Sequence, residues 1–189
     1  LHLCDQNLEQ IEPHQITSTH NLLLDVLLAA KYEGTSLVDN HKEYTKTHGD
    51  FDSNICTELA RSFADIGDII RGKDLYLGDK KEKAKLENNL KKIFGKIYEK
   101  LDEKNVEAKK HYNDIDKNYY QLREDWWNAN RYDVWKAITC KAEQNNKYFR
   151  KACSNDTTWA ENNCQCIGGT VPTNFDYVPQ YLRWFEEWA

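Results

Sequence analysis

Residues 55–72 read ICTELARSFADIGDIIRG, and this stretch decides the fold class of the chain. Its apolar residues follow one another at intervals of four, four, three and four positions, the period of one face of an α-helix. These residues are Ile55, Leu59, Phe63, Ile66 and Ile70. Gly72 ends the pattern, and Gly67 lies inside it at a cost of about 1 kcal/mol to the helix. We therefore predict a buried helix that is capped by Asp52 or Ser53 and is approached closely by a neighbouring backbone at Gly67.

Two carboxylates, Asp65 and Asp68, lie three positions apart in this helix, a spacing that also suits the acidic pair of a catalytic site. Arg61 precedes Asp65 by four positions, and Arg71 follows Asp68 by three. Oppositely charged side chains at these spacings are neighbours on a helix surface. We therefore favour two structural ion pairs, Arg61 with Asp65 and Arg71 with Asp68, over a catalytic role.

Helical periods recur on both sides of this stretch. The further predicted helices cover residues 21–31 with Ser18 or Thr19 as the cap, residues 80 to about 102, residues from 113–116 to about 140, and a last helix that opens at Asp176. Residues 34–50 have no sustained period and predict a loop, and the composition of residues 141–176 predicts an irregular segment. The fold class is therefore all-α: a helical bundle with an irregular Cys-rich segment before the last helix.

Aromatic residues are expected to build much of the core. The chain holds 6 Trp, 11 Tyr and 6 Phe among its 189 residues. Trp126 and Trp127 point in two directions around a helix, so one ring can enter the core while the other meets a second layer or a partner. The alternative is that both rings are packed internally.

The six cysteines form an even set in polar, turn-rich surroundings, which favours disulfides in an oxidising compartment. They are Cys4, Cys56, Cys140, Cys153, Cys164 and Cys166. Fifteen pairings are possible. We favour Cys4 with Cys56, and Cys140 and Cys153 with the two cysteines of Cys164-Gln-Cys166, because neighbours separated by one residue rarely bridge each other. A structural zinc site among the last four is the alternative, but their spacing lacks the usual Cys-x2-Cys pair, so we predict no metal.

No catalytic signature occurs in the sequence. The chain has no Gly-rich phosphate loop, no His-Glu-x-x-His pair and no Gly-x-Ser-x-Gly turn. Its six histidines are dispersed, and a lone histidine is more often structural than catalytic. We therefore predict no enzyme activity, no catalytic residues and no cofactor.

Charge is distributed unevenly along the chain. Residues 80–100 hold eight lysines and three glutamates, a local net charge of +5, while the whole chain carries −5. A row of five lysines falls within about 100 degrees of a helical wheel, and it consists of Lys81, Lys85, Lys92, Lys96 and Lys100. Such a row suits repeated negative groups such as glycan sulfates, although a solvated lysine-rich face is the commoner meaning. The negative total argues against nucleic-acid binding.

Four strings carry a resemblance to a known family. They are LC at 3–4, LARSFADIGDIIRG at 59–72, WWNANRYDVWKAITC at 126–140 and DYVPQYLRWFEEWA at 176–189. Together they resemble the alpha-type Duffy-binding-like (DBL) domain of the erythrocyte membrane protein 1 family, which the malaria parasite Plasmodium falciparum displays on infected red cells.

The resemblance implies a full domain of about twice this length. Residues 1–175 would be its central helical subdomain, and residues 176–189 would begin the next helical subdomain. The implied location is the extracellular face of the infected erythrocyte membrane, within a larger membrane-anchored protein. No apolar run approaches the roughly 20 residues that cross a bilayer, since Asp25 interrupts the longest candidate at 22–30, so we expect no membrane insertion of this chain.

Family members are adhesins, so the resemblance implies rosetting or cytoadhesion. The implied partners are host erythrocyte surface receptors, sulfated or blood-group glycans, antibodies, and the neighbouring DBL subdomains. The shared strings belong to the core and the disulfide framework, so no binding residue is transferred from the family. The alternative function is a structural and antigenic scaffold whose receptor-binding surface lies in other subdomains.

Overall fold

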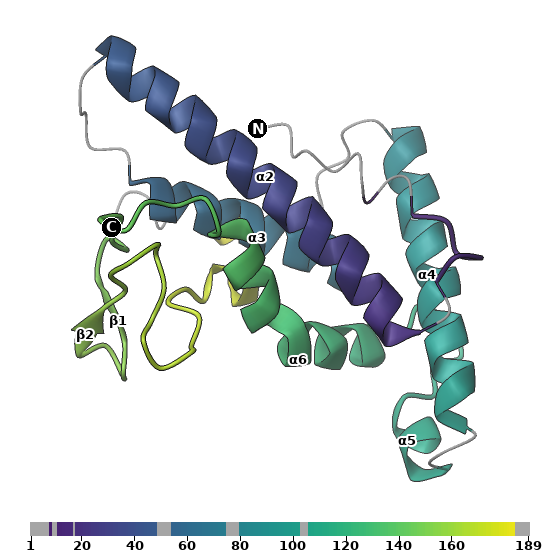
Figure 1. The fold of residues 1–189 in the computed structure, drawn as a ribbon. Coiled ribbons are helices and arrows are strands. Elements are labelled where there is room, and N and C mark those ends of the chain that lie inside the picture. Colours follow the sequence, from purple (N-terminus) through teal and green to yellow (C-terminus); the bar gives the residue numbers. More distant parts are fainter. Residues whose placement is uncertain are drawn as a thin grey trace.

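The structure is a computed structural model that describes residues 8, 11–16, 18–48, 54–74, 80–102 and 106–183 (Figure 1). Its elements in chain order are α2 (Thr19–His48), α3 (Ile55–Arg71), α4 (Lys80–Asp102), α5 (Val106–His111), α6 (Tyr120–Ile138), β1 (Lys151–Cys153), β2 (Thr158–Trp159), the 3-10 helix η1 (Phe175–Tyr177) and α7 (Gln180–Arg183). Strands β1 and β2 form one short antiparallel hairpin. The predicted all-α, disulfide-supported bundle is therefore confirmed.

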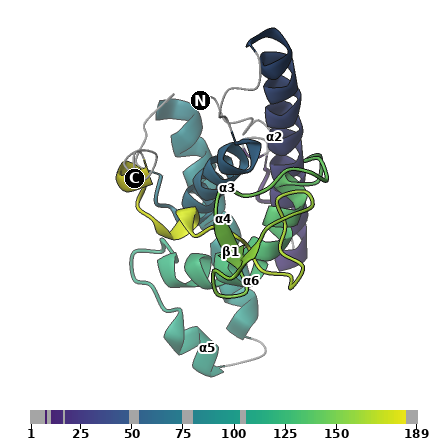
Figure 2. The ribbon, with the colours of Figure 1, turned by 90° about the vertical axis from the view of Figure 1, so that its left-hand side faces the viewer.

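Helices α2, α3 and α6 pack against one another and enclose the main core. Phe63 of α3 lies between two rings of α6, with centroid distances of 5.2 Å to Trp127 and 5.3 Å to Trp135. Helix α4 stands beside this group, with α5 at its end, and touches α6 where Phe94 meets Trp126 edge to face at 6.1 Å (Figure 2). Trp126 and Trp127 are both buried, which agrees with internal packing of both rings.

Helix α2 is longer than predicted. The sequence suggested a helix over 21–31 that stops at Gly34, but α2 continues to His48. A Cβ built on Gly34 would lie 1.9 Å from the carbonyl oxygen of Ile138, so this glycine permits close packing of α2 on α6 instead of ending the helix. The threonines beyond it are accommodated within the helix, where their hydroxyls bond carbonyls of the preceding turn, as Thr35 does to Lys31 at 2.8 Å. Ser18 caps the start, as predicted, since its Oγ accepts the N–H of Asn21.

Helix α3 ends as predicted, at Gly72 with φ of 72°. At Gly67 the predicted close approach is present, but the neighbour is a side chain and not a backbone. A Cβ there would lie 2.7 Å from Cζ2 of Trp127. The residue before the helix is Asn54, whose amide donates to the carbonyl of Lys147 instead of capping α3. The expected caps, Asp52 and Ser53, lie outside the described residues.

Helix α4 has the predicted bounds, whereas α6 begins at Tyr120, several residues later than predicted. The cause is a turn in which the Asp114 carboxylate accepts three backbone N–H groups, those of Asp116, Asn118 and Tyr119. The short helix α5 was not predicted. None of the described helices is both long and apolar enough to cross a bilayer.

The irregular segment between α6 and η1 is held by two disulfides, Cys56–Cys164 and Cys153–Cys166. Cys153 thus bonds one of the two cysteines expected for it, but the predicted Cys4–Cys56 pair is wrong. Cys164 is fully buried and its carbonyl accepts the indole N–H of Trp135, which brings its sulfur to the first turn of α3. Cys140 is exposed and not bonded, contrary to our prediction, and Cys4 lies outside the described residues. The disulfides use three of the four sulfurs of the alternative zinc site.

Candidate receptor-binding surface

The lysine row of α4 lies on the outside of the bundle. The apolar residues of α4 are buried, and they are Leu86, Leu90, Ile93, Phe94 and Ile97. Every lysine of the predicted row is exposed, from Lys81 and Lys85 through Lys92 and Lys96 to Lys100. The structure thus brings the five side chains to one exposed side of α4, along about five turns of helix.

One end of the row borders the N-terminal segment 11–16. The Lys96 ammonium donates to the carbonyl of Pro13, and the Asn89 amide donates to the carbonyl of Ile11 at 3.1 Å. Lys83, which is not part of the row, pairs with Asp74 at 3.0 Å. The N-terminal segment therefore forms one edge of the lysine surface.

A buried arginine of α6 joins α4 to α3. Arg123 of α6 is fully buried and bonds the Glu87 carboxylate through both terminal nitrogens, at 2.8 and 2.9 Å. Its Nε donates to the carbonyl of Ile70 at 2.6 Å and its second terminal nitrogen to that of Ile69 at 3.1 Å. This arginine therefore ties α3, α4 and α6 together.

A second buried cluster docks the C-terminal segment onto α3 and α6. Asp176 is almost fully buried and accepts the indole N–H of Trp127 at 2.9 Å and two N–H groups of Arg131 at 2.8 and 2.7 Å. Arg183 pairs with Asp65 at 2.9 Å and with Asp68 at 2.6 Å. The predicted pair of Arg71 with Asp68 is present at 3.0 Å.

Burial dominates the electrostatics of this cluster. Desolvation raises the pKa of Asp65 to about 6, because the nearby Arg183 guanidinium only partly offsets it. Desolvation also raises the pKa of Asp68, against the lowering effect of Arg183 and Arg71. All these carboxylates accept bonds from arginines, so the cluster holds the C-terminal segment against α3 and α6.

Sequence reasoning missed the arginines that carry these contacts. Arg123 directly follows Leu122 and precedes Trp126 by three positions, so its place beside the apolar face of α6 was a usable signal. Arg183 had no such signal for Asp65, since 118 residues separate the two. Among the residues that the structure describes, no three His, Cys, Asp or Glu side chains form a candidate metal site.

These features define the chain as a disulfide-supported helical domain, in which buried arginines and aromatic rings fix a frame with a basic outer face. Its family can be stated directly. The sequence model of the Duffy binding domain matches residues 1–183, so the chain belongs to the Duffy binding domain family, a family of binding domains and not of enzymes.

Curated relatives are receptors of malaria parasites. The chain is 26% identical over 150 residues to the Duffy receptor gamma form of Plasmodium knowlesi. The aligned region is 78% of this chain and 10% of that protein. It is also 27% identical over 140 residues to the Duffy receptor of Plasmodium vivax. This aligned region is 74% of this chain and 10% of that protein. The chain therefore spans about a tenth of the length of these relatives.

Solved structures of DBLβ domains of PfEMP1 share the fold. An ICAM-1-binding DBLβ domain superposes with a TM-score of 0.71 at 34% identity, over 99% of this chain and 40% of that one. The same domain bound to ICAM-1 gives 0.70 at 35% identity, over 99% of this chain and 42% of that one. The likeness supports a DBL domain of the PfEMP1 type. These neighbours are of the beta type, and the alpha type stays a prediction.

Proposed function

We propose that the chain is the central helical part of an adhesin that binds host cell-surface receptors from the extracellular face of the infected erythrocyte. The observation that carries this proposal is the 34% identity over 99% of the chain to a domain that binds ICAM-1. Recognition then occurs by surface complementarity, with no bond made or broken.

Within this role, the lysine row of α4 is the surface that we assign to negatively charged host groups such as sulfated glycans, and hence to rosetting. Five exposed ammonium groups along one helix form a repeated positive array. Blood-group sugars offer no comparable charge to this row.

The alternative is that the chain serves as a scaffold and antibody target while other subdomains hold the receptor. Two observations favour contact with neighbouring subdomains. The chain covers only 40% of the similar DBLβ domain. Helix α2 also exposes an apolar stripe at four-residue spacing, with Leu24 57%, Leu28 40% and Tyr32 56% accessible. An apolar stripe of this kind suits the remainder of a DBL domain better than open solvent.

The experiment that tests the proposal compares this chain with the complete domain of the natural protein. Both are assayed for binding to erythrocytes, to immobilised heparin and to ICAM-1, with the chemically reduced chain as the control. Binding by this chain, lost on reduction, supports the adhesin assignment. Binding by the complete domain alone establishes the scaffold alternative.

A further inference from the structure

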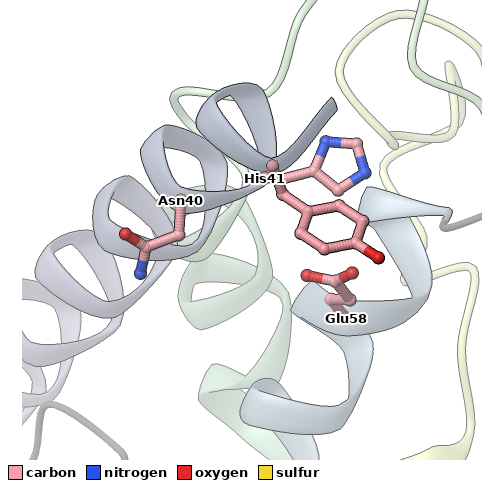
Figure 3. Close-up of a pocket in the computed structure, with 4 residues that line it drawn as sticks. Asn40, His41 and Glu58 are labelled. Atoms are coloured by element: carbon pink, nitrogen blue, oxygen red, sulfur yellow. The ribbon is translucent and has the colours of Figure 1, made fainter. Parts of the chain in front are cut away.

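A hollow of about 440 Å³ lies between the C-terminal half of α2 and the first turns of α3. It is lined by Asn40, His41 and Tyr44 from α2 and by Glu58 from α3 (Figure 3). It lies away from α4, where α2 projects beyond the rest of the bundle in both views (Figures 1 and 2).

The hollow continues the line of the core. Tyr44 follows the buried Val26 by 18 positions, which is five turns of helix, so both lie on the same side of α2. Val38 is the last buried residue of α2 on the way to this end. Beyond it the core side of α2 carries polar and aromatic residues and meets Glu58 of α3. The side of α2 that is buried and apolar up to Val38 is therefore polar and aromatic beyond it, where it lines the hollow.

Three polar groups around the hollow lack partners. The Glu58 carboxylate, the Asn40 amide and the Tyr44 hydroxyl make no hydrogen bond or ion pair in the part of the chain that the structure describes. Glu58 is partly buried, so its carboxylate has lost some hydration without gaining a cation among the described residues. The Tyr44 ring is stacked on the His48 ring at 4.4 Å and 14°, which fixes its orientation.

The charge of the hollow selects the ligand. Glu58 gives it a negative charge, opposite in sign to the lysine row, and the nearby Lys42 is already paired with Glu143 at 2.9 Å. A cation gains from a carboxylate and from the face of a tyrosine ring, and Glu58 and Tyr44 supply these two groups at the hollow. A sulfated glycan would be repelled by the same carboxylate.

We propose that this hollow receives an arginine side chain of a protein partner. The guanidinium would pair with Glu58, for which its planar fork is better matched than a lysine ammonium, and would lie against the Tyr44 ring. Arginine is among the residues that dominate protein interfaces, and a preformed acidic hollow is a suitable receptor for it. The inference rests on the proposed receptor-binding function and adds the kind of side chain that the receptor contributes.

The test is a titration of the isotope-labelled chain, followed by the backbone amide resonances in NMR. The probe is N-acetyl-arginine amide, and its neutral isostere N-acetyl-citrulline amide is the comparison. We expect saturable shifts at residues 40–44 and 58 with arginine in the millimolar range, and an affinity for citrulline at least about tenfold lower.

Two matched variants make the titration specific. Glu58→Gln keeps the shape of the side chain and is expected to weaken arginine binding about tenfold. Glu82→Gln removes an exposed carboxylate of α4, away from the hollow, and is expected to leave arginine binding unchanged. Equal shifts with citrulline or unchanged binding by Glu58→Gln would overturn the inference. So would selective shifts at the same residues with methyl α-glucopyranoside, an uncharged sugar that would mark the hollow as a glycan site.

The titration also separates this inference from the proposed function. It needs no receptor, so a chain that binds erythrocytes or ICAM-1 but ignores arginine rejects the arginine hollow alone. A chain that binds arginine at this hollow while failing to bind any host surface supports the hollow and rejects the adhesin assignment.

Discussion

Arg183 and Asp68 form an ion pair of 2.6 Å although 115 residues separate them in the chain. Both side chains are more than nine-tenths buried. The pair joins the C-terminal segment to the middle of α3, and Asp176 in the same segment is held by Trp127 and Arg131 of α6. The frame that presents the outer surfaces is therefore closed by charged groups as well as by disulfides.

Removing the cation from this cluster is expected to be costly. Arg183→Met would leave the carboxylates of Asp65 and Asp68 short of a positive partner in a desolvated site, and such losses cost about 3–5 kcal/mol. The control is Arg150→Met, since Arg150 is exposed, with an expected effect of about 0.5 kcal/mol or less. Urea unfolding measures both. Equal midpoints for the two variants would contradict the role of Arg183.

Asp65 makes the stability depend on pH in a defined direction. Burial raises its folded-state pKa to about 6 from 3.8, so the folded chain holds the proton more tightly than the unfolded chain does. This contribution to stability is complete below about pH 4 and is lost as the pH rises through about 6. The free energy of unfolding of the wild type, minus that of Asp65→Asn, should therefore fall by about 1–3 kcal/mol between pH 4 and 7.5. A difference that stays constant or rises would be inconsistent with this assignment.

Three helical glycines form a graded series. Alanine at Gly34 would place its Cβ 1.9 Å from the carbonyl oxygen of Ile138, and at Gly67 it would meet the Trp127 ring at 2.7 Å. Overpacking of this kind costs about 1–3 kcal/mol, with Gly34 at the upper end because a backbone cannot rotate away. Gly95 is the control, since its Cβ would meet only the Tyr119 hydroxyl at 3.4 Å, and Gly95→Ala should stabilise α4 by up to about 1 kcal/mol. The midpoints of thermal unfolding should therefore rise from Gly34→Ala through Gly67→Ala to Gly95→Ala. The reverse order would show that Gly34 and Gly67 are not packing positions.

Peptide mapping under non-reducing conditions tests the disulfides. We expect linked peptides for Cys56 with Cys164 and for Cys153 with Cys166, and alkylation of Cys140 in the folded, unreduced chain. Loss of the bond that spans 108 residues should destabilise the chain more than loss of the one that spans 13, by about 1–2 kcal/mol from loop entropy. A Cys4–Cys56 peptide would restore the pairing that the sequence suggested.

The sequence predicted those elements whose pattern is local. Helices α3 and α4 follow from the spacing of their apolar residues, and Gly72 ends α3 through its own positive φ. Gly34 misled the prediction because a glycine that permits helix packing has the same sequence appearance as one that ends a helix. The partner that decides between them, Ile138, is distant in the chain.

Pairings between distant segments could not be predicted from spacing. Cys164 reaches Cys56 only because Trp135 of α6 holds its carbonyl, and Arg183 reaches Asp68 only because the C-terminal segment folds back over α3. The lysine row was visible in advance because five positions on one helix share a side whatever the tertiary fold is. The hollow beside Glu58 could not be predicted, because it forms only where α2 and α3 pack together.

The central claim is that the basic outer face of α4, carried on a fixed frame, recognises negatively charged host groups. The most direct measurement is the salt concentration at which the chain elutes from heparin, compared between Lys85→Gln/Lys92→Gln/Lys96→Gln and the control Lys42→Gln/Lys136→Gln/Lys151→Gln, which removes the same charge from exposed lysines elsewhere. We expect the α4 variant to elute at clearly lower salt than the control, while both variants retain wild-type helicity. Elution of the two variants at the same salt concentration would contradict it.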